Sequence, residues 1–396
     1  MSNQKSRFKI LMEILLSSTK LGLTSFGGPV AHLAYFKDEY IDRRKWLDDR
    51  TYADIIAVCQ FLPGPASSQV GISIGMLRGG ILGGVISWFG FTVPSIMVLI
   101  IFALMYQTFS LEEAGFIHSL KIVAAAVVLH ALIGLGKKLT PDKSRLTIAV
   151  VAAVIMLMYP SAWMQILIIL GAGLLGLSFF KEKAESNVQP IAITIPKRIG
   201  LTSLAVLISL LVILPLLNRL SNNPYLNLFD IFYRVGSLVF GGGHVVLPMI
   251  EREVVPNGLI TANEFLAGYG MAQAVPGPLF TFASYLGTMM EGIAGAIIVT
   301  IAIFLPSFLL IVAALPFLNE LRKHASFQGI LMGVNASVVG ILLAAFYDPV
   351  ISSSIFDTTD FALGILLFGL LTIWKIPAWL IVIIGVIGGY VLQLMV

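Results

Sequence analysis

The chain has 396 residues, 58% hydrophobic and 12% charged, with a mean hydropathy of +0.94. This composition excludes an ordinary soluble domain and predicts an all-α polytopic protein of the lipid bilayer. The net charge of +4 comes from loop residues, so it is a topology signal and does not indicate nucleic-acid binding. The one cysteine, Cys59, excludes an internal disulfide and a multi-thiolate metal site, and we expect no cofactor.

Two interrupted apolar segments open the chain. The first, 10–36, is broken at Phe26-Gly27-Gly28-Pro29, and the second, 51–77, is broken at Pro63-Gly64-Pro65. A Pro-Gly-Pro triplet interrupts a helix because each proline removes a backbone donor and restricts its predecessor. Further runs are long enough to cross a bilayer, given roughly 20 residues per crossing, and they lie near 79–108, 116–136, 145–159 and 161–180.

A polar linker at 181–198 separates this N-terminal repeat (1–180) from a C-terminal repeat (199–396). After an extra span near 199–217, breaks recur at Phe240-Gly241-Gly242-Gly243 and Pro276-Gly277-Pro278. The two kinds of break keep a nearly constant offset between the repeats, which indicates internal duplication. The remaining spans are expected near 291–318, 327–346, 360–374 and 377–395.

The basic residues indicate an orientation. If the broken segments are re-entrant hairpins and the other nine runs cross, 20 of the 25 lysines and arginines fall on one side, which is then cytoplasmic. The odd span near 199–217 makes the second repeat inverted relative to the first. In the alternative topology all thirteen runs cross the bilayer, which moves the basic residues of 37–50 outside.

Inverted hairpins would bring the four breaks together near the bilayer midplane, where half-helix ends face a solute. Helix N-termini there expose backbone N–H groups that favour an anion. Alternatively, the breaks only cap helices or allow close packing, as the glycine spacing at 71, 75, 79 and 83 also does. The candidate binding residues at the breaks are Gly27, Gly28, Gly64, Ser67, Ser68, Gln69, Gly241, Gly242, Gly277 and Thr281.

Lys20 and Arg234 are equivalent positions, because each stands at the same distance before the Phe-Gly-Gly of its own repeat. A charge within a membrane span is costly and marks function by default, and two symmetric cations suit a divalent anion. The alternative is pairing within the fold, since Asp230 lies one helical turn before Arg234 and Lys20 could snorkel.

Histidine and glutamine side chains flank the breaks as well. His32 and His244 could donate to an anion or carry a proton, although a packing role fits them equally. Gln60 and Gln273 are equivalent in the two repeats and could hold either a break or a ligand. For His118, Lys121 and His130, on the 116–136 run, we expect a structural role.

The motif stretches at 21–32, 60–75, 239–248, 265–281 and 303–307 resemble the signature motifs of the chromate ion transporter family, in its long two-domain form. The resemblance implies an inner-membrane exporter of chromate that confers chromate resistance, with sulfate as a structural mimic. A sulfate or other oxyanion permease is the alternative, and homo-oligomerisation is left open. No nucleotide fingerprint or thiol pair supports a membrane enzyme, and a passive channel would not explain the duplication.

Overall fold

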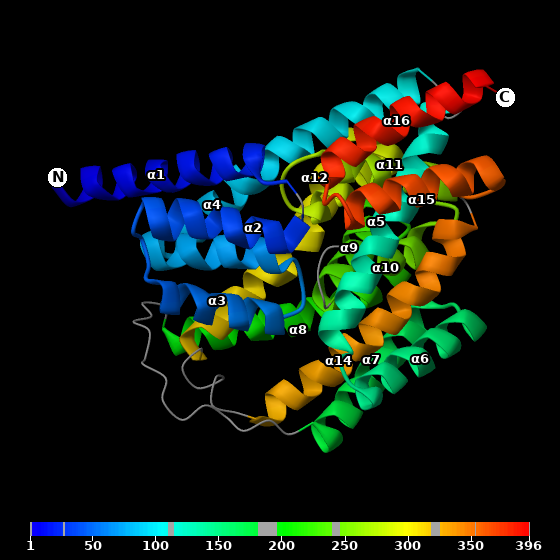
Figure 1. Ribbon diagram of the computed structural model, residues 1–396. Helices are drawn as coiled ribbons and strands as arrows, with labels where there is room; N and C mark the ends of the chain where they lie inside the picture. The colour runs from blue at the N-terminus through cyan, green and yellow to red at the C-terminus, as the bar shows by residue number, and fades with distance from the viewer. Residues whose placement is uncertain are drawn as a thin grey trace.

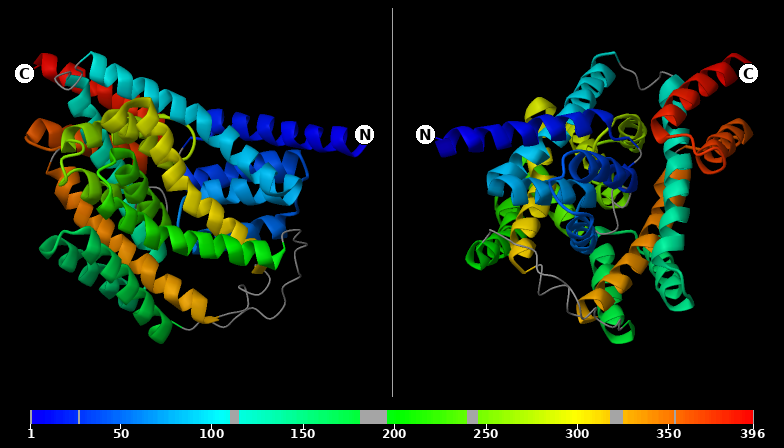
Figure 2. Two further views of the ribbon diagram at one scale, coloured as in Figure 1. Left: turned by 180° about the vertical axis from the view of Figure 1, so that it is seen from behind. Right: turned by 60° about the vertical axis from the view of Figure 1, so that its left-hand side comes forward.

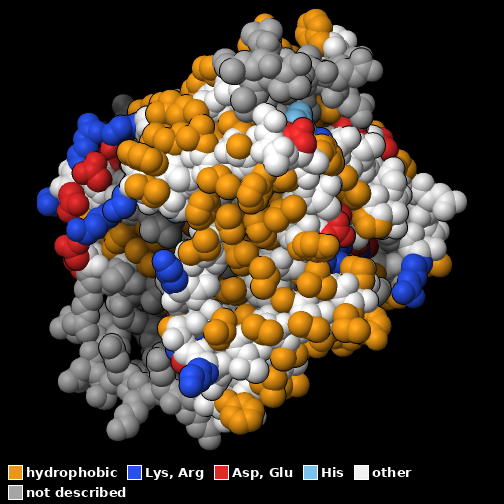
Figure 3. Space-filling model, turned by 45° about the vertical axis from the view of Figure 1, so that its right-hand side comes forward, with side chains coloured by type: hydrophobic (Ala, Val, Ile, Leu, Met, Phe, Trp, Pro, Cys, Tyr) orange, Lys and Arg blue, Asp and Glu red, His pale blue; other side chains and the backbone are white. Residues whose placement is uncertain are grey.

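The computed structural model describes residues 2–26, 28–109, 115–180, 196–239, 246–317, 325–352 and 354–395. These residues form helices and helical turns, with no strand among them, which confirms the predicted all-α class. Four helices in this part of the chain are long and apolar enough to cross a membrane. Hydrophobic side chains also cover a broad face of the surface (Figure 3). The chain is therefore an integral membrane protein.

The first repeat ends before the linker at 181–198, most of which lies outside the described residues. Its elements, in order, are α1 (Ser2–Thr24), α2 (Gly28–Phe36), the π-helical turn η1 (Lys37–Arg43), α3 (Asp49–Phe61), α4 (Ala66–Thr108), α5 (Gly115–Leu139), α6 (Lys143–Met158) and α7 (Ala162–Phe179) (Figure 1). Both predicted breaks are present, between α1 and α2 and between α3 and α4.

The second repeat follows the same order after α8 (Lys197–Leu220), which has no counterpart among the described elements of the first. Its elements are α9 (Pro224–Leu238), α10 (Val246–Val254), α11 (Ala262–Ala274), η4 (Leu279–Thr281), α12 (Phe282–Ala314), η5 (Leu315–Phe317), α14 (Ala325–Ala345), η6 (Phe346–Ile351), α15 (Thr358–Thr372) and α16 (Ala378–Met395).

The long helix α4 is folded back on itself at Gly80, whose φ of 67° lies in the region that favours glycine. The Ser87 hydroxyl donates to the Gly71 carbonyl at 2.8 Å, although a straight helix would separate these residues by about 24 Å. The backbones of Gly75 and Gly83 also touch, and a Cβ on either would strike the other's carbonyl oxygen. The predicted glycine face therefore packs the two arms of α4 against each other.

Helix α12 repeats this construction at Gly292, with φ 63°. Gly287 and Gly295 stand where Gly75 and Gly83 stand in the first repeat, and again a Cβ on either would strike the other's carbonyl oxygen. Each of the two longest helices is thus a short arm, a glycine turn and a long arm that runs back.

The two repeats interlock through their last helices. In the first repeat, α5 packs against α15 and α16 of the second (Figure 2). A Cβ on Gly389 of α16 would collide with the Ser119 side chain of α5. Reciprocally, α14 packs against α6 and α7, where Gly176 touches the backbone of Gly329. The linker thus divides the sequence, but it does not divide the packed structure.

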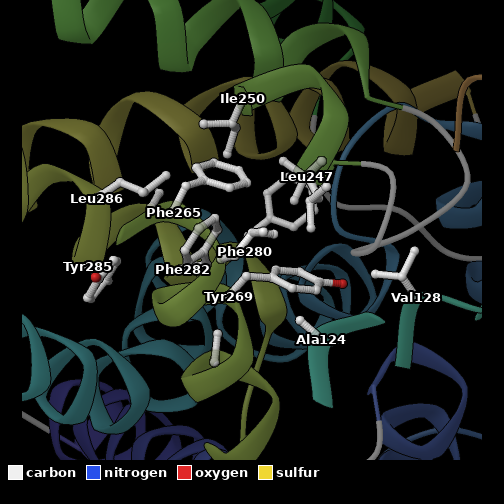
Figure 4. Close-up of a cluster of buried hydrophobic side chains, with 14 of the residues drawn as sticks. Ala124, Val128, Leu247, Ile250, Phe265, Tyr269, Phe280, Phe282, Tyr285 and Leu286 are labelled. Atoms are coloured by element: carbon white, nitrogen blue, oxygen red, sulfur yellow. The ribbon is translucent and has the colours of Figure 1, made fainter. Parts of the chain in front are cut away.

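Aromatic side chains fill the core beside the second Pro-Gly-Pro break. Phe265, Tyr269, Phe280, Phe282 and Tyr285 are at most 1% exposed and gather with Leu247 and Ile250 of α10 (Figure 4). Phe282 meets Phe265 edge to face, with ring centroids 5.1 Å apart. This packing fixes the start of α12 in an apolar surrounding.

Candidate functional site

The helix breaks of the two repeats are joined by reciprocal hydrogen bonds. The backbone N–H of Gly64 donates to the Val239 carbonyl oxygen at 2.6 Å, and the N–H of Gly277 donates to the Ser25 carbonyl oxygen at 2.9 Å. Val239 and Ser25 are equivalent positions, since each directly precedes the Phe-Gly-Gly of its repeat. Each Pro-Gly-Pro tip is therefore held by the residue that follows α1 or α9 in the opposite repeat.

Glycine is required at both tips for two reasons. The φ angles of Gly64 and Gly277 are 116° and 103°, which side-chain-bearing residues rarely adopt. In addition, a Cβ on Gly64 would collide with the Ser307 hydroxyl, and one on Gly277 would lie 2.5 Å from the Ser95 hydroxyl. Both serines come from the Pro-Ser pair of the opposite repeat, so the contact is symmetric as well.

These bonds correct one expectation. The backbone N–H groups of Gly64 and Gly277 are not free for an anion, because a buried N–H must find a partner and each has found a carbonyl. The donors that are left are the first N–H groups of the helices that follow, which have no partner within their own helix.

The N-terminus of α4 is buried and has polar side chains in its first turn. Its N-cap is Pro65, which makes no side-chain cap. Ser67, Ser68 and Gln69 are each at most 2% exposed. The Ser68 hydroxyl and the side-chain oxygen Oε1 of Gln69 have no hydrogen-bond partner within the described part of the chain, while Gln69 Nε2 donates to the Pro63 backbone carbonyl at 2.6 Å. Buried polar atoms without partners are rare and suggest a ligand site.

His32 and Ser307 complete this group from other elements. His32 Nδ1 lies 3.1 Å from the Ser67 hydroxyl, and its ring meets Phe91 edge to face. Ser307 is fully buried, and its hydroxyl has no partner among the described residues. We refer to His32, Ser67, Ser68, Gln69 and Ser307 as the α4 polar cluster.

Among its described residues, the second repeat has no equal of this cluster. Thr281 corresponds to Ser68, but its hydroxyl donates to the Pro278 carbonyl at 2.8 Å within its own turn. Its neighbours Phe280 and Phe282 replace Ser67 and Gln69 and lie in the aromatic core. Gln273 Nε2 has no hydrogen-bond partner in the described structure. The site is thus asymmetric and centred on the first repeat.

Lys20 and Arg234 are not the two free cations that the sequence suggested. Lys20 Nζ lies 2.5 Å from Glu39 Oε2, and Arg234 pairs with Glu253 at 2.7 Å and with Asp230 at 3.2 Å. Each cation is neutralised within its own repeat, as expected if membrane charges are to be paired. The Asp230 partner is the alternative stated above, whereas the sequence reasoning missed Glu39 and Glu253. The available signal was that these two glutamates are separated by the same interval as the two cations.

The remaining predicted residues either lie outside the described residues or have a place in the helices. Gly27, Gly241, Gly242 and His244 lie outside the described residues. Gly28 begins α2 and Gln60 lies next to the end of α3. His118 lies 2.7 Å from Asp360, near the start of α15. Lys121 donates to Asn263, near the start of α11, at 3.1 Å.

Comparison with known sequences decides the family. The sequence profile described as Chromate transporter matches residues 12–177 and 226–390, which is most of both repeats. The chain belongs to the chromate transporter family. No solved structure matches it.

Known relatives of this chromate transporter family member have both the full and the half length. The Chromate transport protein of Pseudomonas aeruginosa is 26% identical, over 83% of this chain and 78% of the relative. The Probable chromate transport protein of Synechococcus elongatus is 25% identical, over 94% of this chain and 93% of the relative. An uncharacterized transporter of Bacillus subtilis is 31% identical over 43% of this chain but 89% of its own length. The match with this relative thus covers less than half of the chain.

Proposed function

We propose that this protein is a secondary transporter that exports chromate across the cell membrane, and that the α4 polar cluster binds the anion. The observation that carries the proposal is the pair of buried hydroxyl groups of Ser68 and Ser307, which have no partner among the described residues, beside an uncapped helix N-terminus. Chromate is the ion named in the protein names of two relatives with long matches.

The chemistry of the cluster suits a tetrahedral dianion. Hydroxyl groups can rotate to donate hydrogen bonds to its oxygens. The first N–H groups of α4 lie at the positive end of the helix dipole, which favours a negative charge. Ser67 and Ser68 supply hydroxyls there and His32 supplies a ring nitrogen, all at most 2% exposed. The anion would satisfy hydroxyl groups whose burial is otherwise unfavourable.

The lengths of the broken helices support re-entrant hairpins. With nine residues, α2 rises about 14 Å, and with thirteen residues α3 rises about 20 Å. Both fall short of the roughly 30 Å hydrocarbon layer. We therefore propose that each repeat forms re-entrant hairpins, that the repeats are inverted, and that the tips meet in the membrane interior as in other transporters with broken helices.

The membrane potential can supply the driving force. With a negative cytoplasm, two charges that leave gain about 4.6 kcal/mol per 100 mV. Export therefore needs no obligatory co-substrate, and the sequence contains no P-loop motif for ATP.

The test is transport by the purified protein in liposomes loaded with labelled chromate. We expect efflux that accelerates when a potassium gradient makes the lumen negative. Unlabelled sulfate should slow efflux if the cluster recognises tetrahedral dianions in general, and equal transport of sulfate would favour the permease alternative. Chromate that stays in the lumen under every potential would reject the proposal.

A further inference from the structure

A pocket lies apart from the α4 polar cluster, between α7, α9 and α10. Its lining residues are Gln165, Ile166, Arg234, Val235, Leu238, Met249 and Glu253. The free volume is about 10 Å³, which is roughly enough for one water molecule. A polyatomic anion fits there only if one of the lining side chains moves out. Two of these side chains, Arg234 and Glu253, form an ion pair.

The ion pair has the geometry with which arginine binds oxyanions. Arg234 directs two nitrogens at the two oxygens of Glu253, with Nη1 to Oε1 at 2.7 Å and Nη2 to Oε2 at 3.3 Å. Asp230 accepts from the third nitrogen, Nε, at 3.2 Å. Two oxygens of a tetrahedral anion match the same fork. The Glu253 carboxylate therefore occupies the position that such an anion would take.

A second donor lines the pocket without a partner. Gln165 on α7 is 2% exposed, and its Nε2 makes no hydrogen bond to any described residue. A buried amide N–H₂ group is normally paired, so this nitrogen is available to a guest oxygen. Arg234 and Gln165 together offer a cation and a neutral donor to one small volume.

The pocket ends close to the helix breaks. Leu238, one of its lining residues, directly precedes Val239, whose carbonyl accepts the Gly64 N–H. The pocket thus lies beside the end of α9 that bonds to the Gly64 tip.

We propose that Arg234 and Gln165 form a second binding site for a tetrahedral oxyanion, and that Glu253 is a tethered carboxylate that occupies this site when no anion is bound. The incoming anion replaces Glu253 on the guanidinium, so Arg234 keeps a negative partner throughout. Only the identity of the anion as chromate depends on the proposed function.

The equivalent pair of the first repeat cannot work in this way. Glu39 accepts hydrogen bonds from three cations, Lys20 at 2.5 Å, Arg44 at 2.6 Å and Arg43 at 3.2 Å. A carboxylate held at three points is not readily displaced, whereas the Glu253 carboxylate bonds to Arg234 alone among the described residues. Glu39 is therefore the matched control for Glu253.

The experiment measures equilibrium binding of labelled sulfate and labelled chromate to the purified full-length protein. All variants carry Ser68→Ala, so that the second site dominates the signal. Glu253→Gln removes the competing charge, and we expect binding to tighten roughly tenfold or more. Adding Gln165→Leu should reverse most of this gain, and adding Arg234→Gln should abolish binding. Glu39→Gln should leave the affinity within about twofold of the Ser68→Ala parent.

Each outcome separates this site from the proposed function. Unchanged or weaker binding in a folded Glu253→Gln variant, or a Gln165→Leu variant that binds as tightly as its parent, would overturn the second site. Neither result would affect chromate efflux through the α4 polar cluster. Conversely, a protein that moves no chromate in liposomes but binds sulfate more tightly after Glu253→Gln would retain this site and lose the proposed function.

Discussion

The N–H of Gly64 donates to the carbonyl oxygen of Val239 at 2.6 Å, which joins the Pro-Gly-Pro tip of the first repeat to the end of α9 in the second. The same bond is made in reverse by Gly277 and Ser25 at 2.9 Å. Each Pro-Gly-Pro tip is thus bonded to the residue before the Phe-Gly-Gly break of the opposite repeat, so the two bonds join the breaks in two pairs across the repeats. If the α4 polar cluster binds the anion, as proposed, these two bonds connect the binding site to both repeats.

The first prediction concerns the tip glycine. Gly64→Ala adds backbone strain and a collision with the Ser307 hydroxyl, so we expect thermal stability in detergent to fall by more than the about 1–2 kcal/mol that the strained φ alone costs. Gly258→Ala is the control, because Gly258 has a φ of 70° and nothing near its Cβ position. The double variant with Ser307→Gly should recover the part of the loss that is due to the collision. Equal losses for Gly64→Ala and Gly258→Ala would mean that Ser307 does not constrain the tip.

The second prediction separates binding from folding at Ser68. Its buried hydroxyl has no partner among the described residues, so Ser68→Ala should leave the free energy of unfolding unchanged or slightly raised. The affinity for chromate should nevertheless fall roughly tenfold or more, because a hydrogen bond to a charged group is lost. The measurement is the concentration dependence of chromate transport in liposomes.

Ser73→Ala is the matched control, since Ser73 is equally buried on the same helix arm but donates to the Gln69 carbonyl at 2.8 Å. It should lose some stability and keep its chromate affinity. If Ser68→Ala transports chromate with the parent affinity, the α4 polar cluster is not the binding site.

The third prediction uses the pH dependence of stability at Glu39, in the turn that follows α2. Burial raises the pKa of this carboxyl, but hydrogen bonds and charges from Lys20 and Arg44 outweigh it and hold the pKa at about 2, below the usual 4.5. A depressed pKa stabilises the folded state above the unfolded value, and this contribution is lost as the pH falls from about 4.5 towards 2. Glu39→Gln should therefore lower stability at pH 7 by about 1.5–3 kcal/mol.

Unfolding midpoints measured between pH 2 and pH 7 provide the test. The curve of the parent should fall more steeply below pH 4.5 than that of Glu39→Gln, and the two should converge near pH 2. Parallel curves would show that the ion pairs of Glu39 add nothing to stability.

The fourth prediction is the orientation of the loops. Cysteines at Asp42 and Ser144 should be protected from an impermeant thiol reagent in whole cells, whereas a cysteine at Thr358 should react, because the basic residues gather on the side of the first two. All three positions are exposed in the structure, and the native Cys59 is buried and should not interfere. Reaction at position 42 from outside would reject the re-entrant hairpins of the first repeat.

The sequence alone determined where the helices begin and end. Proline and glycine act locally on the backbone, so the breaks at Pro63-Gly64-Pro65 and Pro276-Gly277-Pro278 were predicted with the correct boundaries. The later spans were predicted to within a few residues, because an uninterrupted apolar run has few alternatives in a membrane. The constant offset between matching motifs indicated the duplication, since it needs no knowledge of contacts.

Only the tertiary structure decided which groups are satisfied and which are left over. Gly64 looked like a free donor until Val239 was found opposite it, and Lys20 looked like a free cation until Glu39 was found beside it. Both partners come from other elements, and local sequence carries no information about distance between elements. The turn at Gly80 falls at the predicted boundary between the 51–77 segment and the 79–108 run, but only the structure shows that Gly75 and Gly83 pack against each other across it. Hydrogen-bond and ion pairing are properties of the assembled fold, and they restrict the candidate site to the start of α4.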